Sequence, residues 1–180
     1  MTYAFSENYV LPISHDEVVH GKCSLVHKQP GFYADKFAGL KTFYGYMYGH
    51  PGKKLLFMGS EFAQFIEWNY KQELDWLLLD YEKHRQMKNY VKALNKFYLT
   101  HKPMYENDCD WSGFRWIVVD DSIQNVFAFA RFDKAGKFVL CVANFSPVTR
   151  TDYKIGVPKA GKYKVSLNYD SAEFGGNELM

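Results

Sequence analysis

The chain has 180 residues, of which 47% are hydrophobic, and a formal net charge of +2 at pH 7. This composition supports a packed core and excludes a disordered chain, while so small a charge gives no reason to expect nucleic acid or an anionic membrane surface as a partner. No run approaches the roughly 18 apolar residues that cross a bilayer, so we expect no membrane span.

The first part of the chain has the pattern of a strand followed by a helix. Residues 9–14 suggest a strand, although Pro12 weakens this interpretation because proline cannot donate to a ladder. Apolar residues at helical spacing predict a helix over residues 35–49, with Asp35 as its N-cap and Gly49 at its end. The predicted apolar face consists of Phe37, Leu40, Tyr44 and Met47.

A second strand and helix follow. Residues 54–58 form a short apolar run that predicts a buried strand, and residues 59–79 predict a long loop, which in compact domains is often functional. Residues 80–101 predict a helix that Asp80 caps and Pro103 ends. This strand–helix–strand–helix order predicts a parallel sheet with crossover helices over residues 1–103.

The remaining residues, 104–180, are β-like. Short alternating segments separated by turn signals predict an all-β domain, an antiparallel sandwich. In the last segment Tyr163, Val165 and Leu167 alternate with polar residues, which predicts one buried face. The predicted strands are residues 114–119, 126–132, 138–145, 153–157 and 162–169.

The three cysteines are far apart in the sequence. Their odd number and spacing argue against a disulfide framework or a metal site, and we expect small buried apolar residues. The start of the chain lacks the basic stretch and apolar core of a secretion signal, so a cytoplasmic protein is expected. The cysteines are Cys23, Cys109 and Cys141.

A cluster of polar residues comes directly after the first predicted strand. In a barrel of alternating strands and helices, catalytic groups lie at the carboxyl ends of strands, and Asp16 would occupy that position beside His15. A zinc site is one alternative, but the zinc-protease helix needs two histidines four residues apart, whereas His15 and His20 are five apart. A capped turn with solvated charges is the second alternative, and a sugar-processing carboxylate is the third. Residue types alone favour the capped turn and support the carboxylate only weakly, because an aspartate next to a histidine is common.

The surrounding motifs identify a family resemblance. Residues 14–22, which read Ser-His-Asp-Glu-Val-Val-His-Gly-Lys, resemble a conserved region of bacterial glycogen branching enzymes, which belong to the α-amylase family. Ala63 stands where the family pattern leads us to expect glycine, and residues 29–32 also depart from it. Further matching segments occur in the expected order: residues 6–12, 44–47, 49–59, 61–69, 73–76 and 142–147.

The resemblance implies a fold and a reaction. The fold would be an α+β fragment: residues 1–103 as the last two βα units of a (β/α)8 TIM barrel, and residues 104–180 as an incomplete C-terminal antiparallel β-sandwich. The enzyme would cleave α-1,4 links of a glucan with retention and transfer the chain to a 6-hydroxyl. It would use neither a cofactor nor a metal.

The resemblance also assigns residues. Asp16 matches the carboxylate that stabilises the transition state, and His15 matches its neighbour that binds sugar hydroxyls. Glu61 and Trp68 follow the second predicted strand, at the same face as Asp16, and could line the substrate site, with a solvated loop or a packing role as the alternative. The nucleophile and the acid/base residue match no position here, so we expect the fragment alone to be inactive. Another α-amylase-family hydrolase or debranching enzyme, or a glucan-binding module, are the alternatives.

Overall fold

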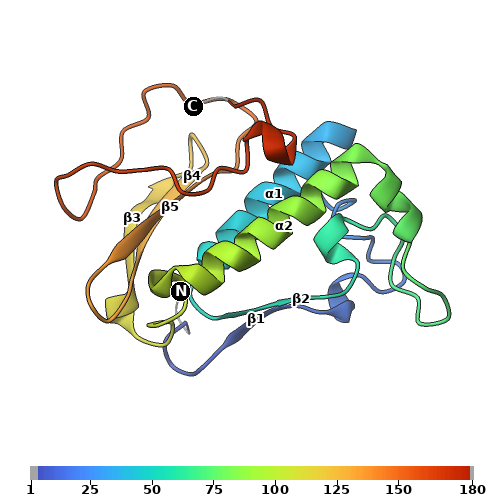
Figure 1. Cartoon of the computed structure of the whole chain (residues 1–180), viewed down its shortest axis with the longest axis horizontal. Coiled ribbons are helices and arrows are strands. Elements are labelled where there is room, and N and C mark those ends of the chain that lie inside the picture. Colours follow the sequence, from blue (N-terminus) through green and yellow to red (C-terminus); the bar gives the residue numbers. More distant parts are fainter. Residues whose placement is uncertain (1–3, 179–180) are drawn as a thin grey trace.

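Two short parallel strands begin the fold in the computed structural model, which describes residues 4–178 (Figure 1). Strand β1 (Val10–Ile13) pairs in parallel with β2 (Lys53–Leu56). Parallel strands need a long crossover, and helix α1 (Tyr33–Gly49) provides it. The parallel pairing predicted from the sequence is therefore confirmed. The described part of this sheet contains only these two strands, which leaves both with a free edge and explains why Pro12 is tolerated.

The second strand is less buried than predicted. Its side chains alternate between exposed and half-buried positions, and Leu55 is 42% exposed. The prediction of a buried strand is wrong here because only β1 pairs with β2 in the described residues, and a strand becomes fully buried only between neighbours and covering layers.

Helix α1 begins two residues earlier than predicted. Phe32, and not Asp35, is the N-cap residue, so the predicted cap position is wrong. The Asp35 carboxylate still accepts a hydrogen bond from the backbone N–H of Phe32 at 3.0 Å, because a carboxylate in the first turn can satisfy a free N–H group there. The helix ends at Gly49, as predicted.

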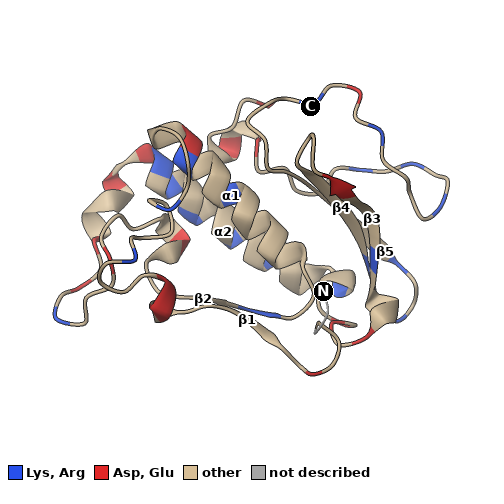
Figure 2. Ribbon diagram, turned by 180° about the vertical axis from the view of Figure 1, so that it is seen from behind, with Lys and Arg blue, Asp and Glu red and all other residues tan. Residues whose placement is uncertain are grey.

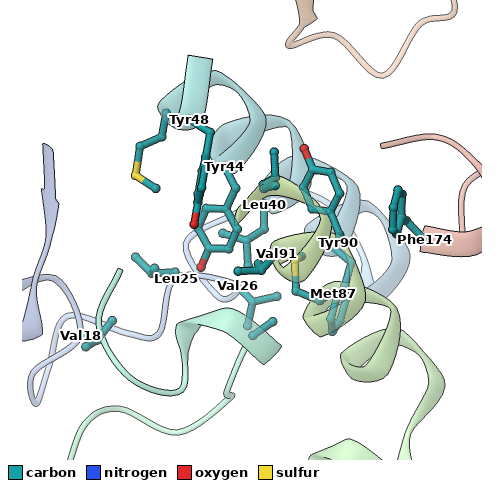
Figure 3. Close-up of a cluster of buried hydrophobic side chains, with 14 residues drawn as sticks. Val18, Leu25, Val26, Leu40, Tyr44, Tyr48, Met87, Tyr90, Val91 and Phe174 are labelled. Carbon is teal, nitrogen blue, oxygen red and sulfur yellow. The ribbon is translucent and has the colours of Figure 1, made fainter. Parts of the chain in front are cut away.

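Helix α2 (Glu82–Thr100) packs beside α1, and the two share the main core. Figure 3 shows Leu40 and Tyr44 of α1 facing the same cluster as Met87 and Val91 of α2. Tyr81, without a side-chain hydrogen bond, precedes α2, so the predicted Asp80 cap is wrong. No helix in residues 4–178 is both long and apolar enough to cross a membrane.

Three antiparallel strands form the second sheet, in the order β3–β4–β5. These strands are β3 (Phe114–Asp121), β4 (Val126–Phe132) and β5 (Phe138–Asn144), all at positions that the sequence predicts. The prediction of strands at residues 153–157 and 162–169 is wrong, because these residues pair with no other strand. Their alternating side chains have no sheet face to cover, and Tyr163 and Val165 are exposed.

The end of α1 lies directly against the second sheet. A Cβ atom on Gly49 would come within 2.9 Å of the Phe129 ring and 3.1 Å of the Cys141 sulfur, so glycine allows this close approach. At the middle of α1, the Lys41 ammonium donates hydrogen bonds to the carbonyls of Phe174 (2.9 Å) and Tyr169 (3.3 Å). The C-terminal segment therefore packs against the helices, and in Figure 1 its short helical turn lies beside them.

The prediction of buried cysteines is wrong for two of the three, and Cys141 is half-buried. Cys23 and Cys109 are exposed, because both lie in loops, while Cys141 lies on β5. Burial raises the pKa of the Cys141 thiol to about 11.

Candidate functional site

The polar segment after β1 forms a short, capped 3-10 turn. Ser14 is its N-cap, and the Ser14 hydroxyl oxygen accepts a hydrogen bond from the backbone N–H of Asp16 at 3.3 Å. The turn His15–Glu17 closes when the Val18 N–H donates to the His15 carbonyl at 2.9 Å. In Figure 2 this acidic turn is red at the end of the parallel strands. The segment therefore lies at the carboxyl end of a strand, as the sequence predicts.

His15 and Asp16 lie side by side and are open to solvent. The His15 Nε2 atom is 3.3 Å from Oδ1 of Asp16, and the Ser14 hydroxyl donates to Oδ2 of Asp16 at 3.4 Å. The two side chains are 49% and 69% exposed. A carboxylate in this position is held by its neighbours and is still accessible to a ligand.

Trp68 joins this pair from a distant part of the chain. Its ring packs edge-on against His15, with centroids 5.4 Å apart, and against Phe57 at 5.7 Å. Phe57 directly follows β2, and its N–H donates to the Ile13 carbonyl at 2.9 Å, which aligns the ends of the two strands. The structure thus brings together three of the four predicted site residues.

Glu61 lies on a separate turn, Ser60–Phe62, which is firmly held. Tyr44 donates its hydroxyl to the Ser60 carbonyl at 2.9 Å, and Nδ1 of His84 lies 2.8 Å from the Phe62 carbonyl. In the described residues, the contacts that join His15, Asp16 and Trp68 do not include Glu61. Burial, followed by the negative charge of Glu61, raises the pKa of Tyr44 well above its usual value.

The turn that carries Glu61 also shows why the family pattern leads us to expect glycine at position 63. Ala63 has a φ of +58°, in the left-handed region that favours glycine. Glycine is therefore the residue expected at this position on physical grounds. Alanine can adopt the conformation, at a cost of roughly 1–2 kcal/mol.

An open hollow lies beside Trp68. It is lined by Val19 and His20 from the loop after β1 and by residues 66–72 from the loop after β2. The lining combines the aromatic rings of Trp68 and Tyr70 with amide and charged side chains. Such a surface suits a ligand that has both apolar faces and many hydroxyl groups.

Glu67 lies close to these residues, and sequence reasoning assigned no functional role to it. Its carboxylate accepts hydrogen bonds from the backbone N–H groups of Gly21 (2.9 Å) and Cys23 (2.7 Å), and it lies 3.4 Å from Nδ1 of His20. The Cys23 and Gly21 hydrogen bonds, with a smaller effect from His20, lower the pKa of Glu67. Backbone donors carry no residue-type signal, so sequence reasoning could find Glu67 only as part of a matching motif.

The three residues considered for a zinc site each pair with a different charged side chain. His15 pairs with Asp16, Glu17 with Lys28, and His20 with Glu67. In residues 4–178, no group of three or more histidines, cysteines and carboxylates could hold a metal ion.

Comparison with known proteins adds sequence similarity to this geometry. The family described as "Alpha amylase, C-terminal all-beta domain" matches residues 116–180, which include most of β3 and all of β4 and β5. A 1,4-alpha-glucan branching enzyme GlgB of Halothermothrix orenii is 57% identical over 176 residues, 97% of this chain. Those of Bacillus caldolyticus and Aquifex aeolicus are 54% and 52% identical, each over 98% of the chain. The chain is a homologue of part of these branching enzymes.

The resemblance expected from the motifs is therefore confirmed, as is the assignment of the end of the chain to the C-terminal all-β domain of the α-amylase family. The chain spans 28%, 27% and 28% of the lengths of the three branching enzymes. The roles of individual residues remain predictions.

Proposed function

We propose that this chain is part of a 1,4-α-glucan branching enzyme, a hexosyltransferase that cleaves α-1,4 links of a glucan and makes α-1,6 branches. The observation that carries the proposal is the exposed Asp16 carboxylate at the end of β1, in contact with His15. The high identity to branching enzymes over nearly the whole chain supports it.

The proposed architecture follows from the order of elements. Residues 1–103 would form the last two βα units of a (β/α)8 barrel, and residues 104–180 its C-terminal β domain. The parallel pairing of β1 with β2 and the position of the polar turn after β1 support this proposal, because barrel enzymes place their sites at the carboxyl ends of strands. The two parts contact each other through Gly49 and Arg131.

The proposed reaction assigns each site residue one task. A retaining transfer uses a nucleophilic carboxylate and an acid/base carboxylate about 5–5.5 Å apart. We assign both to residues of the enzyme outside this chain. Asp16 would stabilise positive character at the sugar carbon, and His15 would donate to a sugar hydroxyl. Trp68 would offer its ring to the sugar and hold His15, while Glu61 would line the outer part of the site.

The proposed substrate is an α-glucan such as amylose or glycogen. The hollow lined by residues 66–72 supports this choice, since aromatic rings cover the apolar faces of sugars and amides bind their hydroxyls. The reaction needs no cofactor or metal, and a cytoplasmic location fits this substrate.

A branching assay of the complete enzyme tests the proposal. Incubation with amylose is expected to produce new α-1,6 links while the number of reducing ends stays constant. An increase in reducing ends without new branches would instead indicate a hydrolase, and loss of α-1,6 links in a parallel incubation with glycogen would indicate a debranching enzyme. Either of these outcomes would overturn the proposal.

A further inference from the structure

The loop that follows the turn His15–Glu17 is bound to the loop after β2 by three hydrogen bonds. The Glu67 carboxylate accepts hydrogen bonds from the backbone N–H groups of Gly21 and Cys23. The Trp68 N–H donates a hydrogen bond to the Val18 carbonyl at 2.8 Å. The two adjacent residues Glu67 and Trp68 therefore hold residues 18–23 from both ends. This loop begins one residue after the turn that carries Asp16.

The backbone of the loop is shaped to offer its N–H groups to one anion. Gly21 and Cys23 both have left-handed backbone angles, with φ of +83° and +63°. Such a conformation turns nearby N–H groups toward a common point and creates a concave site for an anion. In this chain the anion is the Glu67 carboxylate, and each of its two oxygens accepts one N–H group. A cysteine in the left-handed region is unfavourable by itself, so the carboxylate offsets strain in the loop.

The same two residues also hold the side chain beside Asp16. Trp68 packs edge-on against His15, and His15 in turn contacts the Asp16 carboxylate. A displacement of residues 67–68 would therefore move Asp16 in two ways. It would shift the His15 ring that contacts Asp16, and it would shift the backbone of residues 18–23 that follows Asp16.

We propose that Glu67 is a positioning residue for the branching reaction, which fixes the loop at residues 18–23 and, with Trp68, the orientation of His15 and Asp16. This inference rests on the proposed function. Glu67 acts through the backbone and through Trp68 and does not itself need to touch the glucan.

Glu67→Gln in the complete enzyme is the direct test. The glutamine oxygen can accept only one of the two N–H groups, and its amide group places a donor against the other. We expect kcat to fall about tenfold or more, because misplacement of a catalytic group by 1 Å can cost up to about 10²-fold. Hydrogen exchange at the amides of residues 18–23 is expected to become faster, without a change in the rest of the chain.

Glu73→Gln is the matched control. Glu73 lies on the same loop, and its side chain is exposed. This variant is expected to keep the kcat and the hydrogen exchange of the unchanged enzyme. If Glu67→Gln behaves like Glu73→Gln in both measurements, the positioning role is overturned.

A second variant covers the case in which Glu67→Gln does not fold. Glu67→Asp keeps the negative charge but is one methylene shorter, and its kcat is expected to lie between those of the unchanged enzyme and the glutamine variant. A folded aspartate variant with unchanged kcat and unchanged exchange would also overturn the inference. If the unchanged enzyme hydrolyses amylose without branching it, the proposed function fails. The rate of hydrolysis and the exchange at residues 18–23 then still decide the role of Glu67.

Discussion

Arg131 and Asp108 form an ion pair inside the fold, with side chains that are 0% and 2% exposed. The Arg131 guanidinium also donates to the Gly49 carbonyl at 2.8 Å, and the Lys53 ammonium lies 2.9 Å from the second oxygen of Asp108. Burial opposes the charge of Asp108, but the hydrogen bonds and charges of Lys53 and Arg131 keep its pKa below the usual value. The buried Arg131–Asp108 pair, with Lys53 at its exposed side, thus joins the second sheet to the end of α1 and to the start of β2.

Arg131→Met is expected to lower the free energy of unfolding by about 3–5 kcal/mol, because it leaves a buried carboxylate with only one charged partner. Lys53→Met is the control. It removes the other cation, but Lys53 is 55% exposed, so the expected loss is below about 1 kcal/mol. Urea denaturation followed by tryptophan fluorescence measures both. Equal losses of unfolding free energy in the two variants would show that the buried Arg131–Asp108 pair does not stabilise the fold more than the exposed Lys53–Asp108 pair does.

The contrast between these residues explains what the sequence could predict. Strands β4 and β5 were predictable because alternation and turn signals are local. The segment at residues 162–169 has the same alternation but finds no partner strand, and pairing is a property of the whole fold. Asp16 could be located from its motif, whereas the roles of Glu67 and Arg131 depend on backbone groups that residue types do not reveal.

Asp16→Asn in the complete enzyme keeps the shape of the side chain and removes its charge. The expected result is a loss of about 10²–10³ in kcat, which is typical for removal of one preorganised electrostatic group. The melting temperature should stay close to that of the unchanged enzyme, because Asp16 is 69% exposed. Initial rates of branch formation on amylose measure the effect. A variant that retains a near-normal rate would exclude the assigned role.

Buried lysines should make the fold more stable as the pH rises above neutrality. Burial lowers the pKa of Lys54 from 10.5 to about 7 and that of Lys41 from 10.5 to about 8. From about pH 7 to the ordinary lysine pKa, the unfolded chain therefore binds more protons than the folded chain. The free energy of unfolding then rises with pH, by at most about 1.4 kcal/mol per pH unit for each group.

Above about pH 10 the trend should reverse. Burial raises the pKa of Tyr48 from 10.0 to about 12, so unfolded tyrosines lose their protons before folded ones do. Urea denaturation at several values between pH 7 and pH 11 is expected to show a maximum near pH 9–10. Lys54→Met should flatten the rise between pH 7 and pH 9. A rise that is unchanged in this variant would show that Lys54 does not cause it.

The 180-residue chain by itself is expected to form no branches and to release no reducing ends from amylose. Retaining transfer requires a carboxylate nucleophile and a separate acid/base carboxylate, and the family resemblance assigns only Asp16 in this chain. An iodine-stain assay together with a reducing-end assay on the purified chain measures both activities. Turnover by the chain alone would mean that a second carboxylate within it acts as the nucleophile.

The isolated chain is also expected to associate in solution. In the described residues β1 and β2 have only each other as partners, and β5 forms one edge of the second sheet. Apolar side chains are exposed on both sheets, with Leu55 of β2 at 42% and Val142 of β5 at 53%. Unpaired edges that carry exposed apolar residues favour pairing with another copy, and a lysine on an edge strand opposes it.

Val142→Lys should therefore shift the chain toward monomer, as measured by size-exclusion chromatography with light scattering. Ile123→Lys is the matched control, because Ile123 is 91% exposed but lies in the turn between β3 and β4. If the unchanged chain elutes as a sharp monomer and melts cooperatively, its edges are not sites of association.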